Sequence, residues 1–292
     1  MPSSAPFDIV LFGPVAADLV VVDGRETPTT GGGVWYGAFP LLTLGLKVAV
    51  VTRLAKVHFP VLERLRAAGA EVFPIQAFQS SGIRNVYHDP GMETRTCTML
   101  GSSGPLLPEA IPPLTGRLLY GGALLRGELP VETVRFLAAR GPVSVDLQGY
   151  LRYRSGNDLL TGPFGALPEL LSLSSWVKAD LAEMKMATGL DEPGQGAATL
   201  ASFGPREVVI SGPGYLSVMA GGSFHKSPLD PSSMAGRTGR GDTAMCTYLG
   251  ARLKGAPPAQ ALDCAAWVTS RKMETPGPYE GPVPLPARSG IS

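Results

Sequence analysis

Cysteine and histidine are both scarce in this chain, which has three of each among its 292 residues. Cys97, Cys246 and Cys264 are far apart and lie among apolar residues, so their spacing indicates neither a disulfide framework nor a zinc site. We expect them to pack as small hydrophobic side chains. The histidines are equally dispersed, which argues against a histidine metal site.

Long apolar runs and clusters of basic residues are also missing. No apolar stretch approaches the roughly 20 residues that a membrane helix requires, and the segment before Phe7 is too short and polar for a signal peptide. The net charge is +1 and no run of Lys or Arg stands out, so nucleic acid is not an expected partner. These features predict a cytoplasmic protein that binds neither membrane nor nucleic acid.

What the sequence does contain is a regular alternation of two patterns. Short apolar runs typical of buried strands alternate with segments of helical periodicity, several of which end at a glycine. The expected strands are 7–12, 46–51, 71–75, 117–120, 142–147, 175–179 and 207–211, and the expected helices are 60–68, 130–140, 181–188, 243–254 and 258–271. This alternation predicts an α/β fold with a mostly parallel central sheet and helices on both faces. We expect residues 1–292 to form one domain.

Two segments, at about 19–30 and 83–99, depart from this alternation. They combine strand-forming residues with the turn signals Asp23-Gly24 and Asp89-Pro90-Gly91. Such turns are typical of antiparallel ribbons. Two ribbons that leave an α/β body predict a small β-ribbon lid over a ligand cleft.

The clearest chemical signal is the turn Thr238-Gly239-Arg240-Gly241-Asp242, which leads into the expected helix 243–254. Glycines before a helix let backbone N–H groups converge, and the helix dipole adds positive charge, so the turn is suited to an anion. An aspartate beside a bound phosphate is useful if it accepts a proton from an attacking hydroxyl. The alternative is an ordinary N-cap aspartate after a glycine turn.

This turn resembles the second signature of the ribokinase-like (PfkB) carbohydrate kinases, Asp-Thr-x-Gly-Ala-Gly-Asp. The resemblance implies a ribokinase-like three-layer fold, with Asp242 as the catalytic base and Gly239, Arg240 and Gly241 as the anion hole. Thr238 belongs to the same phosphate-binding turn. Arg240 stands in place of the usual Ala, and Gly236 in place of the leading Asp. That region helps to bind a monovalent cation in ribokinase-type members, so with Gly236 in this place the resemblance does not imply cation activation.

The acceptor site is implied by two earlier matches. Gly31-Gly32-Gly33 is similar to the glycine pair of the first family signature, in which glycines permit close backbone approach to a hydroxylated ligand. Tyr36 stands where many sugar kinases have Asn. Asp18 follows the first strand, where the family commonly has an Asp that binds substrate hydroxyls. The alternatives are a glycine-rich turn before a core helix and a solvated turn aspartate.

The donor site is implied by two later matches. Asp180 and Glu183 resemble the family's Asn-x-x-Glu motif, whose Glu organises Mg²⁺, an ion that needs only one or two carboxylates. Ser211, Gly212 and Gly214 occupy the place of the turn beside the nucleotide. ATP and Mg²⁺ are therefore the expected cofactors. The alternative for the acidic pair is stabilisation of a helix N-terminus.

The segment Asp146-Leu147-Gln148-Gly149-Tyr150-Leu151-Arg152 is similar to the Asp-x-Gln-Gly-x-x-Arg variant of the myo-inositol-kinase-like branch. That resemblance implies that Gln148 contacts a ring hydroxyl and that Arg152 contacts phosphate or the lid. Arg95, on the second ribbon, is expected to close over the ligand. The alternative is that these are surface groups.

Taken together, these matches predict ATP-dependent phosphorylation of a hydroxyl on a small sugar or polyol. We expect the acceptor to lie between Asp18, Gly32, Tyr36, Gln148 and Asp242, and the lid to pair two copies into a homodimer. A nucleoside or other sugar kinase and a non-catalytic ligand-binding relative stay open as alternatives. A nicotinamide oxidoreductase is disfavoured because no Gly-x-Gly-x-x-Gly follows the first strand.

Overall fold

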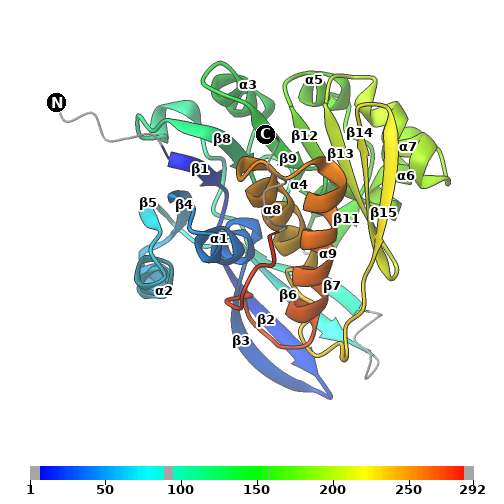
Figure 1. Cartoon of the computed structure of the whole chain (residues 1–292). Helices are drawn as coiled ribbons and strands as arrows, with labels where there is room; N and C mark the ends of the chain where they lie inside the picture. Colours follow the sequence, from blue (N-terminus) through cyan, green and yellow to red (C-terminus); the bar gives the residue numbers. More distant parts are fainter. Residues whose placement is uncertain (1–6, 89–94, 157, 286–292) are drawn as a thin grey trace.

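The computed structural model describes residues 7–88, 95–156 and 158–285 (Figure 1). A nine-stranded sheet forms the centre of this part of the chain. From one edge to the other its strands are β15 (Ser223–Pro228), β14 (Tyr215–Ala220), β13 (Glu207–Gly212), β12 (Trp176–Asp180), β9 (Val143–Asp146), β8 (Gly116–Gly121), β1 (Phe7–Phe12), β4 (Val48–Ala55) and β5 (Glu71–Ala77). Only the β13–β14 and β14–β15 pairs are antiparallel. The predicted α/β fold with a mostly parallel sheet is confirmed.

The central strands form because their sequences are apolar on both faces, as expected for parallel strands covered on two sides. In β1, Ile9 and Leu11 join one hydrophobic core, while Val10 and Phe12 join the other. The sheet is therefore the middle layer between two cores.

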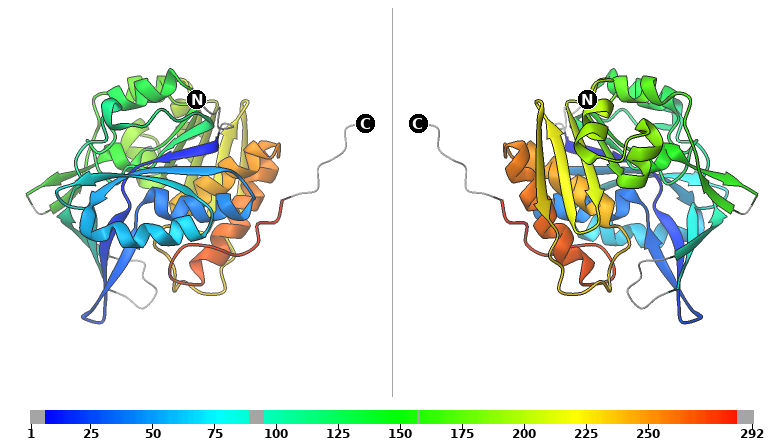
Figure 2. Two further views of the ribbon diagram at one scale, coloured as in Figure 1. Left: turned by 90° about the vertical axis from the view of Figure 1, so that its left-hand side faces the viewer. Right: turned by 90° about the vertical axis from the view of Figure 1, so that its right-hand side faces the viewer.

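Helices cover both faces of the sheet (Figure 2). One core is closed by α1 (Gly33–Thr43), α2 (Glu63–Ala67), α8 (Arg240–Leu253) and α9 (Pro258–Met273). The other is closed by α3 (Val131–Ala138), α4 (Gln148–Leu151), α5 (Leu167–Ser172), α6 (Leu181–Thr188) and α7 (Pro193–Ala201). In the part of the chain that the structure describes, no helix is both long and apolar enough to cross a bilayer.

A second sheet of six strands projects from the main body as the lid. Its order is β10 (Arg152–Ser155), β11 (Asp158–Thr161), β7 (Arg95–Gly101), β6 (Gly82–Tyr87), β2 (Ala16–Val22) and β3 (Arg25–Gly31). The two predicted ribbons are antiparallel pairs, and β2 joins them by pairing in parallel with β6. The expected turn at 89–91 lies outside the described residues.

Several elements differ from the sequence prediction. The β10–β11 ribbon was not predicted, because its strands have four residues each and are mostly exposed, so they lack an apolar pattern. The expected helix 60–68 is a 3₁₀ segment, η1 (Lys56–Leu62), followed by the short α2, since Pro60 interrupts regular helix hydrogen bonding. A second 3₁₀ segment, η2 (Pro108–Ala110), precedes β8. The three cysteines are free thiols, as predicted.

Candidate active site

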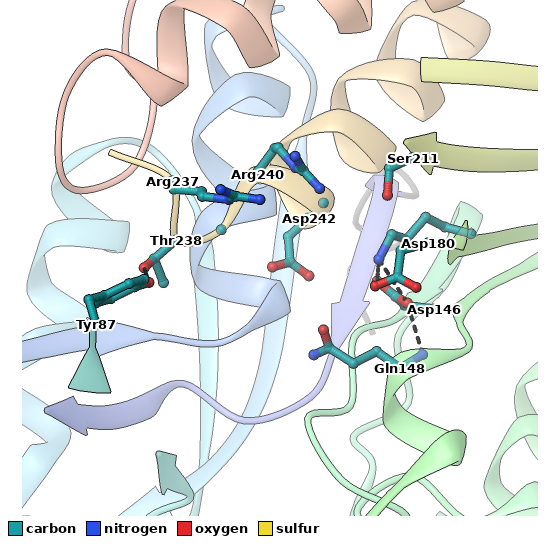
Figure 3. Close-up of a pocket in the computed structure, with 12 residues that line it drawn as sticks. Tyr87, Asp146, Gln148, Asp180, Ser211, Arg237, Thr238, Arg240 and Asp242 are labelled. Atoms are coloured by element: carbon teal, nitrogen blue, oxygen red, sulfur yellow. Dashed lines mark hydrogen bonds and ion pairs between the residues drawn. The ribbon is translucent and has the colours of Figure 1, made fainter. Parts of the chain in front are cut away.

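A polar cavity of about 270 Å³ lies where the carboxyl ends of β9, β12 and β13 meet the start of α8 and the lid strand β6 (Figure 3). Ligands of open α/β sheets bind at this end of the strands. The cavity is lined by Tyr87, Asp146, Gln148, Lys178, Asp180, Ser211, Arg237, Thr238, Gly239, Arg240, Gly241 and Asp242. Eight of these residues are among the sites expected from the sequence, namely Gln148, Asp180, Ser211, Thr238, Gly239, Arg240, Gly241 and Asp242.

The start of α8 is shaped by Gly239. This residue caps the helix in the left-handed region, with φ of 82°, and a Cβ atom there would overlap the ring of Tyr36. A glycine is needed for both reasons. The first N–H groups of a helix lack an intrahelical acceptor, so that of Gly241 is available at the cavity wall for an anion.

Asp242 is in the first turn of α8, and its carboxylate points into the cavity on the side of Gln148 (Figure 3). Burial raises its pKa to about 6, and the negative charge of Asp146 adds to the shift, whereas Lys178 and Arg152 oppose it. A carboxylate with this pKa is ionised at neutral pH and is a better proton acceptor than a fully solvated aspartate.

Lys178, on β12, supplies a buried positive charge beneath the anion site. Its Nζ lies 2.9 Å from Oδ2 of Asp146 and 3.9 Å from Oε2 of Glu183. A Cβ atom on Gly241 would lie 2.9 Å from the same Nζ, so the ammonium group is against the turn. Burial alone lowers the pKa of Lys178, but the carboxylates of Asp146 and Glu183 outweigh it and keep the group charged.

Asp180 and Glu183 form a capping box at the start of α6. The backbone N–H of Asp180 donates to Oε2 of Glu183 at 2.7 Å, and that of Glu183 donates to Oδ1 of Asp180 at 2.8 Å. Asp180 lines the cavity, whereas Glu183 lies behind it, where burial raises its pKa to about 7 although Lys178 opposes the shift. The two side chains therefore stabilise the start of α6, which was the alternative interpretation of this acidic pair.

No group of three or more His, Cys, Asp or Glu side chains suited to a metal occurs among the described residues. The carboxylates at the cavity wall still fit Mg²⁺, since that ion keeps several waters and binds through one or two carboxylates together with substrate phosphates. Of the three carboxylates at the cavity wall, Asp146 pairs with Lys178 and Asp242 lies on α8, so Asp180 is the one that would hold the ion. Glu183 would orient Asp180 from behind.

The expected acceptor residues Asp18, Gly32, Gly33 and Tyr36 do not line this cavity. The Asp18 carboxylate is buried and accepts a hydrogen bond of 2.8 Å from the N–H of Ile83, so it joins β2 to β6 within the lid. Gly33 lies against Asp242, because a Cβ atom there would be 2.8 Å from Oδ1 of that residue. Gly32 caps α1 with φ of 99°. Tyr36 is buried under the 238–242 turn.

The remaining expected residues lie around the edge. Arg152 begins β10 and does not line the cavity, although its charge lowers the pKa of Asp242. Gly212 and Gly214 make the tight β13–β14 hairpin, in which Gly212 pairs with Tyr215 and Gly214 has φ of 71°. They are not at the cavity, which ends at Ser211. The side chain of Arg95 lies outside the described residues.

Sequence reasoning missed four residues as parts of the site, namely Asp146, Lys178, Arg237 and Tyr87. Tyr87 joins the lid to the turn, because its hydroxyl lies 2.9 Å from Oγ1 of Thr238. A signal was available for Lys178, since a charged residue inside the apolar run 176–180 must find a buried partner. Tyr87 and Arg237 carried no comparable signal in the local pattern.

No family model matches the sequence, and no curated protein sequence matches it. Solved structures do match. A pyrophosphate-dependent kinase of the ribokinase family, in complex with a pyrophosphate analogue and myo-inositol, has a TM-score of 0.86 and 28% identity, covering 93% of this chain and 97% of that chain. A pyrophosphate-dependent myo-inositol-1 kinase converted into a myo-inositol-3 kinase by two substitutions has a TM-score of 0.86 and 27% identity, with 93% and 95% covered. Arabidopsis thaliana ribokinase with ribose and ATP has a TM-score of 0.73 and 17% identity, with 94% and 95% covered.

Proposed function

We propose that the chain is a ribokinase-like (PfkB) sugar or polyol kinase, like the structural neighbours at 27–29% identity, and that it phosphorylates a hydroxyl of a small ring polyol resembling myo-inositol. The observation that carries the proposal is the position of Asp242. It is the only carboxylate on the first turn of α8, at the anion-binding N-terminus, and it shares one cavity with Gln148. Structures that are 27–29% identical include kinases described with myo-inositol.

In this proposal the acceptor ring lies between Gln148 and Asp242. Gln148 hydrogen-bonds a ring hydroxyl, and Asp242 accepts the proton of the hydroxyl that attacks. A new P–O bond forms to that oxygen while the bond from phosphorus to the leaving phosphate breaks. The N–H groups at the start of α8, together with Lys178 and Arg240, hold the phosphate oxygens. Mg²⁺, when bound, adds charge neutralisation at the donor phosphates.

The donor is a separate question. ATP, the donor expected from the sequence, needs an apolar surface for adenine, but among the described residues that line this cavity Tyr87 is the one large ring. Beyond Ser211 the chain enters the β13–β14 hairpin, in which Gly212 pairs with Tyr215. Pyrophosphate needs only the polar, cationic part of this cavity. The polar lining of the cavity favours pyrophosphate over ATP as the donor. The pyrophosphate-dependent kinases at 27–29% identity support the same choice.

The deciding experiment offers each donor, with Mg²⁺, to a panel of inositols, sugars and nucleosides. Product formation is followed by ³¹P NMR, which detects the new phosphate monoester whichever donor is used. Asp242→Asn is the matched control, because it keeps the shape of the site and removes the base. Turnover of an inositol with pyrophosphate supports both parts of the proposal, and turnover with ATP alone restores the sequence-based expectation.

Two outcomes would count against a polyol kinase. Preference for a nucleoside would assign the chain to another acceptor class of the same family. Donor binding without turnover across the whole panel would indicate a non-catalytic relative. Pairing of two copies through the lid stays a prediction that sedimentation velocity can test.

A further inference from the structure

A buried ammonium group without an acidic partner lies behind the phosphate-binding turn. Lys272, in the last turn of α9, is 1% exposed. Its Nζ donates to the carbonyl oxygen of Gly236 at 2.6 Å and to that of Thr275 at 3.4 Å. It also lies 5.3 Å from the centre of the Tyr36 ring. Within the described residues no carboxylate pairs with it, and burial lowers its pKa to about 8.

One of the carbonyls that Lys272 contacts belongs to Gly236, in the segment that leads directly into the 238–242 turn. Gly236 donates its N–H to the carbonyl of Met273 at 2.8 Å, and a Cβ atom at Gly236 would overlap the carbonyl of Thr275. The loop is thus packed tightly on the end of α9. Three residues after Gly236 the chain reaches Gly239, which lies on the same Tyr36 ring that Lys272 approaches.

Burying a charge is costly unless nearby dipoles replace the lost water. Here two carbonyl oxygens, the negative end of the α9 dipole and an aromatic face all favour a cation at one point. Carbonyl oxygens that converge from separate segments are also the ligands that a free monovalent cation would take. Without a positive charge there, the carbonyls of Gly236 and Thr275 would repel each other and the loop would lose its anchor.

We propose that Lys272 is a positioning residue whose ammonium group acts as a built-in monovalent cation, fixing residues 236–239 and through them the phosphate-binding start of α8. The role rests on the proposed function, because it acts through the turn that binds the donor. It predicts that the wild-type protein is indifferent to K⁺ and that truncation of Lys272 makes the protein depend on an added cation.

The test is chemical rescue of Lys272→Ala. A cavity of about 490 Å³, bordered by Lys272, Gly236 and Thr238, gives small ions a path to the vacated space. In choline chloride the variant should lose roughly 10-fold or more in turnover, the equivalent of one charge-assisted hydrogen bond. Ammonium or potassium chloride at the same ionic strength should restore much of it, while the wild type stays unchanged.

Lys272→Met is the matched control. Its side chain fills the same space without a charge, so it should lose turnover as the alanine variant does but gain nothing from ammonium or potassium. A merely structural role for Lys272 would instead leave the alanine variant as the worse of the two and neither variant sensitive to the cation.

Thermal unfolding separates this inference from the proposed function, since it needs no turnover. The melting temperature of Lys272→Ala should rise with ammonium or potassium relative to choline, and those of the wild type and Lys272→Met should not. If the alanine variant folds only with the cation present, that result also supports the role. Full activity of Lys272→Ala in choline, absence of rescue, or a wild type that requires K⁺ would overturn it.

Discussion

Gly239 lies directly on the ring of Tyr36, so closely that a Cβ atom at position 239 would overlap the ring. The ring is buried, and Lys272 approaches it as well. The path of the 238–242 turn is therefore set by α1, which carries Tyr36, and by α9, which carries Lys272. Tyr36 therefore supports the turn that lines the cavity without lining the cavity itself.

Gly239→Ala should abolish most turnover. The new methyl group meets the Tyr36 ring and the φ of 82° is strained for alanine, so the N–H groups at the start of α8 move away from the donor. Gly255→Ala is the matched control, because Gly255 has φ of 94° but open space around it. Gly255→Ala should cost about 1–2 kcal/mol in the free energy of unfolding, and Gly239→Ala should cost more because its methyl group also meets the Tyr36 ring. Urea denaturation measures both. Only Gly239→Ala should lose activity, and equal activity in the two variants would contradict the packing argument.

Asp242→Asn should lower kcat on the order of 10²- to 10⁴-fold while leaving the fold intact. In the proposed reaction Asp242 accepts a proton only when ionised, and its pKa is raised to about 6. The rate should therefore rise with pH through about 6 and level off above it. A pH–rate profile of kcat/KM checks this, and a profile that is flat between pH 5 and 8 would remove Asp242 from the role of base.

The same substitution should stabilise the protein at high pH. The pKa of Asp242 is about 6 in the folded protein against an ordinary 3.8. The raised pKa therefore stabilises the folded state below pH 3.8, and this stabilisation is lost as the pH rises through about 6. Each pKa unit corresponds to about 1.4 kcal/mol. Asp242→Asn should thus melt at a higher temperature than the wild type at pH 8, with the difference shrinking toward pH 4. A variant less stable than the wild type at pH 8 would contradict this reasoning.

Arg240→Ala should weaken donor binding more than acceptor binding. Arg240 lines the cavity at the start of α8, where a guanidinium meets phosphate oxygens in the proposed complex. Loss of a charge-assisted contact corresponds to roughly a 10-fold or larger increase in the KM for the donor. Arg140→Ala is the control, since that guanidinium stacks on Phe136 and does not line the cavity. An unchanged donor KM would place the phosphates elsewhere.

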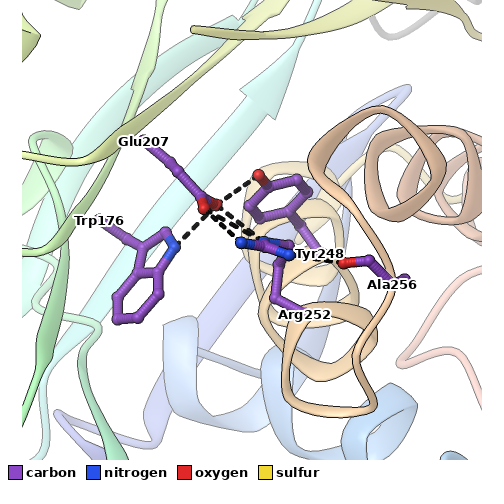
Figure 4. A network of polar contacts seen from close by, with 5 residues as sticks. All are labelled: Trp176, Glu207, Tyr248, Arg252 and Ala256. Atoms are coloured by element: carbon purple, nitrogen blue, oxygen red, sulfur yellow. Dashed lines mark hydrogen bonds and ion pairs between the residues drawn. The ribbon is translucent and has the colours of Figure 1, made fainter. Parts of the chain in front are cut away.

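Glu207 anchors the far half of α8 (Figure 4). Its carboxylate accepts from Nε1 of Trp176 at 2.8 Å, from the hydroxyl of Tyr248 at 2.5 Å and from Nη2 of Arg252 at 2.7 Å. Glu207→Ala leaves these donors without an acceptor, so the free energy of unfolding should fall by about 3–5 kcal/mol. Glu169→Ala removes an exposed pair with Arg135 and should cost only about 0–1 kcal/mol. Urea denaturation measures both, and similar losses would contradict the anchoring role.

The main sheet could be predicted because each buried parallel strand is a short, nearly continuous apolar run in the sequence. A strand such as Phe7–Phe12 is apolar on both faces, and the glycines that end helices are local signals too. The hairpin of β10 and β11 was missed because its short, mostly exposed strands carry no apolar pattern and form by pairing with each other and, at one position, with β7. In such segments the partner, and not the local pattern, decides the structure.

The amino-acid sequence by itself determined the alternation of strands and helices, the glycine turn and the aspartate at the start of α8. These depend on residues within one or two turns of each other. Only the tertiary structure decided that Gln148 and Asp242 share a cavity while Asp18 is used inside the lid, and that Lys178 and Lys272 bring buried charges to the turn. Contacts between residues so far apart in the chain depend on strand order and helix packing, which no local pattern specifies.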